Sequence, residues 1–211
     1  MPPASLISRL FDIQGRVAIV TGASSGLGEG LARALAEAGA RVAVVARRQD
    51  RLAKMADQIG AWPVGCDLLD LDALGRVVPQ VVETLGPPEI LVNAAGNVFT
   101  RERAENEPLD AILDTLKLHV VASFRLAQDV FPHMVSVGRG SVINISSISG
   151  HVGVPGIPQA SYAASKLGLS GLTAELAVQW AAKSIRVNTV APGFFRSEIT
   201  DELYDDERGK A

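Results

Sequence analysis

The protein has 211 residues, enough for one hydrophobic core but short for two, so one domain spanning residues 1–211 is expected. Apolar residues make up 47% of the chain and charged residues 20%, a globular balance that excludes intrinsic disorder. The formal net charge of −3 excludes a basic surface for nucleic acid, and the single cysteine, Cys66, excludes an internal disulfide and a cysteine-based zinc site.

Short β-branched runs alternate with longer helical stretches along the chain. The expected strands are 16–20, 41–46, 63–65, 90–93, 141–146 and 185–190. The expected helices are 26–38, a polar helix ending at 60, 71–85, 109–135 and 161–182. This alternation predicts an α/β fold of the Rossmann type, a doubly wound parallel sheet in three layers, with the ligand at the carboxyl ends of the strands.

A glycine-rich turn follows the first expected strand and opens the first expected helix. Its glycines allow backbone N–H groups to approach a pyrophosphate closely, and the helix N-terminus adds partial positive charge. A turn without a ligand is the alternative, but the flanking strand and helix favour a dinucleotide site. The residues expected to bind it here are Gly22, Ser24, Ser25, Gly26, Leu27 and Gly28.

Two arginines, Arg47 and Arg48, follow the second expected strand, where a NAD-selective site would offer an acid to the adenosine ribose. A guanidinium there can pair with a 2′-phosphate, and no carboxylate stands at that strand end to repel it. NADP(H) is therefore favoured, with NAD(H) possible. Arg47 is the stronger candidate, since Arg48 can equally be the solvated start of the next helix.

A phenol and an ammonium, Tyr162 and Lys166, stand four residues apart near the start of an expected helix, so both project from one face. Reduction of a carbonyl needs a proton at its oxygen, and a phenol with a pKa of about 10 delivers or accepts one poorly near neutral pH. The neighbouring ammonium and a positive nicotinamide both favour the phenolate and lower that pKa. The pair therefore predicts acid–base chemistry by Tyr162.

These motifs, in this order, resemble the short-chain dehydrogenases/reductases, whose glycine turn has the form T-G-x-x-x-G-x-G and whose catalytic helix carries Y-x-x-x-K. The resemblance implies a catalytic serine three residues before Gly150, which is Ser147, with Ser146 as the adjacent alternative. A hydroxyl there can donate to the substrate oxygen and stabilise its developing charge.

The resemblance also implies cofactor contacts at other strand ends. An Asp after the third strand would hold the adenine ring, the sequence at 93–96 resembles an N-N-A-G motif with its second Asn replaced by Ala, and a P-G turn would approach the nicotinamide carboxamide, with Ser in place of the usual Thr after it. The residues implied are Asp67, Leu68, Asn93, Ala94, Gly96, Pro192, Gly193 and Ser197, with Tyr162 and Lys166.

Three features depart from the family pattern. His119 stands where an Asn would hold a proton-relay water, so it is a candidate catalytic residue or, equally, a core histidine. The active-site loop of about 150–160 carries extra residues and is expected to form an apolar wall with Val152, Val154, Pro155 and Ile157. The family's substrate-covering segment and last strand are not found, so the lid region from about 194 is expected to be incomplete.

The combined prediction is an NADP(H)-dependent enzyme that interconverts a carbonyl and a secondary alcohol on a small-molecule substrate. A catalytically silent dinucleotide-sensing regulator with the same fold is the alternative. The three histidines lack metal-ligand spacing, and neither a secretory signal nor a bilayer-spanning stretch is found, so we expect no metal, no membrane and a cytoplasmic location. The resemblance implies a homo-oligomer, either a tetramer or a dimer.

Overall fold

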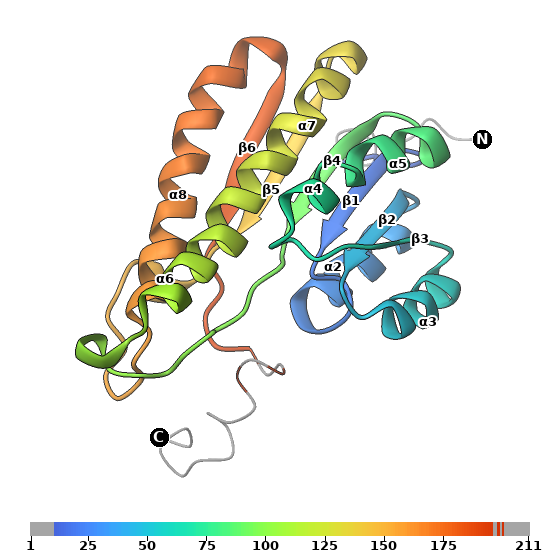
Figure 1. The fold of residues 1–211 in the computed structure, drawn as a ribbon. Coiled ribbons are helices and arrows are strands. Elements are labelled where there is room, and N and C mark those ends of the chain that lie inside the picture. The colour runs from blue at the N-terminus through green and yellow to red at the C-terminus, as the bar shows by residue number, and fades with distance from the viewer. Residues whose placement is uncertain (1–10, 196–197, 199, 201–211) are drawn as a thin grey trace.

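A six-stranded parallel sheet forms the centre of the computed structural model, which describes residues 11–195, 198 and 200 (Figure 1). The strands are β1 (Val17–Thr21), β2 (Arg41–Ala46), β3 (Trp62–Gly65), β4 (Pro88–Asn93), β5 (Gly140–Ile145) and β6 (Ile185–Val190). Their order is β3-β2-β1-β4-β5-β6, and every neighbouring pair is parallel. The order reverses between β1 and β4, which confirms the predicted doubly wound sheet and places a ligand crevice at their carboxyl ends.

Helices cover the sheet on both faces. They are α2 (Gly26–Glu37), α3 (Gln49–Ile59), α4 (Leu71–Leu74), α5 (Val77–Leu85), α6 (Leu109–Leu116), α7 (Ala122–Val137) and α8 (Ala160–Trp180), with short turns η1 (Ala104–Asn106), η3 (Ile148–Gly150) and η4 (Ala181–Lys183). Alternate residues of β1 enter different cores: Ala18 and Val20 pack with α2 and α3, whereas Val17 and Ile19 pack with α4, α5, α7 and α8. Burial on both faces explains why β1 is apolar from Val17 to Val20.

The helix expected over residues 71–85 is two helices, α4 and α5. A continuous helix would need an N–H at Pro79 to bond to the Gly75 carbonyl, and proline has none. Asp70 caps α4, because its carboxylate accepts from the N–H groups of Asp72 and Ala73, both at 3.0 Å.

The expected helix over residues 109–135 is also divided. A π-helical turn, η2 (Lys117–Val121), lies between α6 and α7 and carries His119 into the interior. Turns of this kind insert one residue into the helical ladder and are common near functional sites. Within the described part of the chain, no helix is long and apolar enough to cross a membrane, and no group of three potential ligands could hold a metal ion.

Candidate active site

An open cavity of about 510 Å³ lies at the carboxyl ends of the strands and includes the β1–β4 crevice. Its volume falls within the range of roughly 300–1,000 Å³ typical of ligand sites. Of the residues expected from the sequence, those that line it are Gly22, Ser24, Ser25, Gly26, Leu27, Gly28, Arg47, Arg48, Asp67, Leu68, Ala94, Gly96, Ser147, Tyr162, Lys166, Pro192 and Gly193. Asn93 and His119 do not line it, and Ser197 lies outside the described residues.

The glycine turn is packed so closely that side chains would not fit. Gly22 has φ +66°, and a Cβ on it would lie 2.7 Å from the Ala95 Cα; a Cβ on Gly28 would lie 2.4 Å from the Gly22 carbonyl oxygen. Thr21 fixes the other side of the crevice, since its Oγ1 accepts from the N–H groups of Ala94 at 3.1 Å and Ala95 at 3.2 Å. Backbone therefore forms the floor of the cavity, as a bound pyrophosphate requires.

The N-terminus of α2 points its backbone donors into the same cavity. The N-cap residue, Ser25, makes no side-chain capping hydrogen bond, so its hydroxyl does not satisfy the first N–H groups of the helix. Uncapped donors and the partial positive charge of a helix N-terminus favour an anion. The turn thus fits a dinucleotide phosphate.

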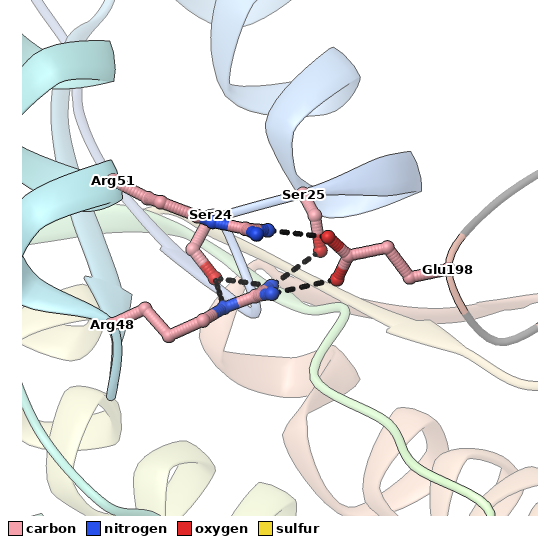
Figure 2. Close-up of polar contacts among 5 residues, drawn as sticks. All are labelled: Ser24, Ser25, Arg48, Arg51 and Glu198. Carbon is pink, nitrogen blue, oxygen red and sulfur yellow. Dashed lines mark hydrogen bonds and ion pairs between the residues drawn. The ribbon is translucent and has the colours of Figure 1, made fainter.

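The two arginines after β2 differ in orientation. The Arg47 side chain is exposed, whereas Arg48 turns toward the glycine turn, where its guanidinium donates to the Ser24 hydroxyl at 3.0 Å and the Ser25 hydroxyl at 2.7 Å (Figure 2). The stronger sequence candidate was Arg47, but the structure brings Arg48 to the serines. Arg51 lies on the same face of α3 three residues later, a spacing that the sequence analysis missed.

A carboxylate, Glu198, lies between Arg48 and Arg51 (Figure 2). Its Oε2 accepts from Arg48 Nη1 at 2.7 Å, and its Oε1 pairs with Arg51 Nη1. These hydrogen bonds lower the pKa of Glu198 to about 2. The expectation that no carboxylate stands at this strand end is wrong, because Glu198 comes from beyond β6, 150 positions away from Arg48 in the sequence.

Ser147 and Tyr162 meet at the opposite end of the cavity. The Ser147 hydroxyl acts to lower the pKa of the phenol, as does the charge of Arg101. Burial of Tyr162 is the larger effect, however, and raises that pKa. Burial thus holds the phenol protonated, whereas its pKa was expected to be lowered by Lys166 and a positive nicotinamide.

Lys166 is buried behind Tyr162, with its Nζ 5.6 Å from the centre of the phenol ring. The ammonium donates to the Ile145 carbonyl at the end of β5, at 2.9 Å. Burial lowers the pKa of Lys166 to about 8, because the charged form loses its hydration. Lys166 can therefore gain or lose a proton near physiological pH.

The two neighbouring serines after β5 have different partners. The Ser146 hydroxyl donates to the Lys166 carbonyl at 2.6 Å and so attaches the strand end to α8. The Ser147 hydroxyl accepts from the N–H of Ser149 at 3.1 Å and faces Tyr162. The geometry thus favours Ser147 over Ser146 as the group beside the phenol.

His119 has a partner at each ring nitrogen. The Ser165 hydroxyl donates to the Tyr162 carbonyl at 2.7 Å, so it accepts from His119 Nδ1, also at 2.7 Å. The other nitrogen, Nε2, accepts from the N–H of Asn97 at 3.1 Å. Burial, and then the charge of Lys166, lower the pKa of His119 well below its usual value, so the ring is neutral.

This bonding leaves no ring nitrogen of His119 available for a relay water. The imidazole instead meets the Tyr162 ring edge-on, with 5.4 Å between ring centres. Of the two interpretations left open by the sequence, the geometry favours a core histidine that supports the catalytic helix.

Asn93 lies behind the wall of the cavity and connects three elements. Its Nδ2 donates to the side-chain oxygen Oδ1 of Asn144 at 2.8 Å, and Nδ2 of Asn144 donates to the Thr173 hydroxyl at 2.9 Å. This chain of bonds joins β4, β5 and α8. The Asn93 side chain is thus bonded within this chain and does not line the cavity, and its expected cofactor contact stays a prediction.

The loop residues expected to form an apolar wall do not line the substrate end of the site. A smaller cavity of about 60 Å³ beside Ser147 and Tyr162 includes Gln159 and Arg101, but none of the four apolar loop residues expected to line it. Of positions 151–159, Gln159 alone contributes to that lining. Arg101 was missed because it lies in an irregular segment after β4, where no periodicity indicates its direction.

The fold and this cavity together define a dinucleotide-binding α/β protein with a Ser–Tyr–Lys group at one end of the site. Comparison with known proteins agrees with this description of the fold and site. The short chain dehydrogenase family matches residues 16–208. The 3-oxoacyl-acyl-carrier-protein reductase FabG of Thermotoga maritima is 35% identical over 208 residues, covering 94% of this chain and 82% of that protein.

Two solved structures show the same likeness in three dimensions. A short-chain type dehydrogenase/reductase from Mycobacterium marinum has a TM-score of 0.90 and 37% identity, covering 95% of this chain and 81% of its own. A provisionally assigned NAD(P)-dependent gluconate 5-dehydrogenase from Beutenbergia cavernae, with NADP bound at low occupancy, has a TM-score of 0.87 and 35% identity, covering 94% and 80%. The chain belongs to the short-chain dehydrogenase/reductase family, oxidoreductases that act on alcohol and carbonyl groups with NAD(P).

Proposed function

We propose that the protein is an NADP(H)-dependent oxidoreductase that interconverts a carbonyl and a secondary alcohol. The observation that carries the proposal is the placement of Ser147, Tyr162 and Lys166 on the lining of one cavity that also contains the glycine turn. The cofactor would rest its pyrophosphate on the turn and the N-terminus of α2. Arg48 would pair with its 2′-phosphate, and Tyr162 and Lys166 would lie at its nicotinamide end.

The proposed chemistry uses three side chains. When bound, the nicotinamide supplies or takes up the hydride. Ser147 donates a hydrogen bond to the substrate oxygen, and Tyr162, whose raised pKa keeps it protonated, delivers the proton to that oxygen during reduction. Lys166 keeps a positive charge behind the phenol and stabilises the phenolate left by that transfer.

The test is turnover and cofactor binding with variants of the two reacting side chains. NADPH and NADH are offered with ketones, sugar acids and 3-oxoacyl thioesters, and the nicotinamide absorbance is followed. Tyr162→Phe should lower kcat about a hundredfold or more, because the general acid is lost, while the Kd for NADPH stays close to that of the wild type.

Adjacent serines supply the matched control. Ser147→Ala should lower kcat about a hundredfold, whereas Ser146→Ala, which removes a hydroxyl bonded to the Lys166 carbonyl, should mainly lower stability. Cofactor binding without turnover on every substrate would refute the proposed reaction and favour a dinucleotide sensor.

A further inference from the structure

A compact group of polar side chains lies beside the glycine turn, where β2 ends (Figure 2). Arg48 contacts the hydroxyls of Ser24 and Ser25, and Arg51 adds a second guanidinium from the next turn of α3. Two guanidinium groups and two hydroxyls within one contact network are the donors that a phosphate monoester prefers.

Glu198 is the one carboxylate in this group, and it binds as a phosphate would. One carboxylate oxygen bonds to Arg48 and the other to Arg51, so the anion bridges the two guanidinium groups. All three side chains remain partly exposed, between 40% and 50%. They are therefore open to exchange with an anion from solution.

We propose that Glu198 is an internal competitor for the 2′-phosphate of NADP(H): its carboxylate occupies the Arg48–Arg51 pair and must leave that pair when the phosphate binds. The inference rests on the proposed use of NADP(H). Glu198 then controls how strongly the protein prefers a 2′-phosphorylated cofactor, and Arg51 becomes part of the site.

Mutual repulsion is the physical reason that the two anions exclude one another. Glu198 is ionised throughout the physiological range, since its pKa is about 2, and a 2′-phosphate carries between one and two negative charges. Both would occupy the space between the same guanidinium groups. A cofactor that ends in a ribose hydroxyl brings no such charge and leaves the ion pairs intact.

The experiment is calorimetric titration of the full chain with 2′,5′-ADP and 5′-AMP, two probes that differ by the 2′-phosphate. In Glu198→Gln we expect the affinity for 2′,5′-ADP to rise about tenfold, the size expected for release of two partly exposed ion pairs. The affinity for 5′-AMP should not change. Glu105→Gln is the matched control, because Glu105 also pairs with an arginine, Arg103, and is not among the residues lining the cavity.

A third variant separates competition from a structural role. In Arg51→Gln the affinity for 2′,5′-ADP should fall, and adding Glu198→Gln to it should give much less than the tenfold gain, because one of the two ion pairs is already absent. A merely structural Glu198 would change binding of both probes and would not depend on Arg51.

Two outcomes would overturn the inference. An unchanged affinity for 2′,5′-ADP in Glu198→Gln would show that the carboxylate does not compete, and weaker binding of 5′-AMP would show that it accepts a ribose hydroxyl and favours NAD(H). Neither outcome bears on whether Tyr162 performs carbonyl reduction, which the turnover assay tests separately with either cofactor.

Discussion

Replacing Lys166 with Met should make the protein more stable while removing its activity. Lys166 is only 4% exposed, and its pKa falls from 10.5 to about 8 on burial alone. The difference of about 2.5 between these values corresponds to roughly 3 kcal/mol of destabilisation of the charged form. Loss of the hydrogen bond to the Ile145 carbonyl offsets about 1 kcal/mol, so the expected gain is about 2 kcal/mol.

The stability difference between Lys166→Met and the wild type should depend on pH. Because the pKa of folded Lys166 lies below its unfolded value, the destabilisation is fully present below about pH 8. Between about pH 8 and 10.5 the folded state releases the proton first, and the stability of the wild type rises. The advantage of Lys166→Met should therefore be greatest near neutral pH and shrink as pH rises through this window.

Urea unfolding of both proteins at about pH 7 and about pH 9.5 measures this difference. Lys183→Met, at an exposed position in η4, should show no comparable gain. The reasoning fails if Lys166→Met is the less stable protein at neutral pH, or if the difference between it and the wild type is the same at both pH values.

Substitutions at three further positions, His119, Gly28 and Thr21, test other parts of the site. His119→Ala should lower the free energy of unfolding by about 3 kcal/mol in urea, because it leaves a cavity and an unpaired backbone N–H, whereas His119→Asn should keep the fold and the turnover. Gly28→Ala should weaken NADPH binding at least tenfold in a fluorescence titration, since its Cβ would lie 2.4 Å from a carbonyl oxygen. Thr21→Val should lower the free energy of unfolding by about 2 kcal/mol, since two backbone N–H groups lose their acceptor.

Gly28→Ala and Thr21→Val each have a control variant in the same element, as His119→Asn is for His119→Ala. Gly30→Ala, where a Cβ meets nothing within 4 Å, should bind NADPH normally, and Thr21→Ser, which keeps the accepting oxygen, should unfold close to the wild type. If His119→Asn stayed folded and bound NADPH but lost turnover, His119 would have a direct catalytic role that its hydrogen bonds do not indicate.

Most of the sheet could be predicted because its strands are short apolar runs between glycine or charged residues. The bounds of β2 and β6 agree with the expected ranges 41–46 and 185–190, and the others differ by one or two residues. The helices were harder to predict. Nothing in the local sequence marks the π-helical turn at 117–121, whose geometry depends on packing against α8.

At the cofactor end of the site, the local sequence predicts the glycine turn but not the partners of Arg48. The glycine turn was predictable because the spacing of its glycines between one strand and one helix is a local pattern, although Gly22 also packs against Ala95 after β4. The environment of Arg48 was not, because it depends on Arg51, whose spacing was overlooked, and on Glu198, which reaches the site from the far end of the chain. Charge pairing across such a separation leaves no periodic pattern in the sequence.

Three titratable side chains behind the substrate position have clearly separated protonation states. Burial holds Tyr162 protonated and His119 neutral, and the charge of Lys166 further opposes a second cation at His119. Lys166 alone among them has its pKa moved to about 8, and since burial is the only cause, no described carboxylate offsets the lost hydration. A core selected for stability alone would place an apolar side chain here. The destabilisation is understandable if a positive charge beside Tyr162 is needed for proton transfer, a need that a protein limited to sensing the dinucleotide would not have.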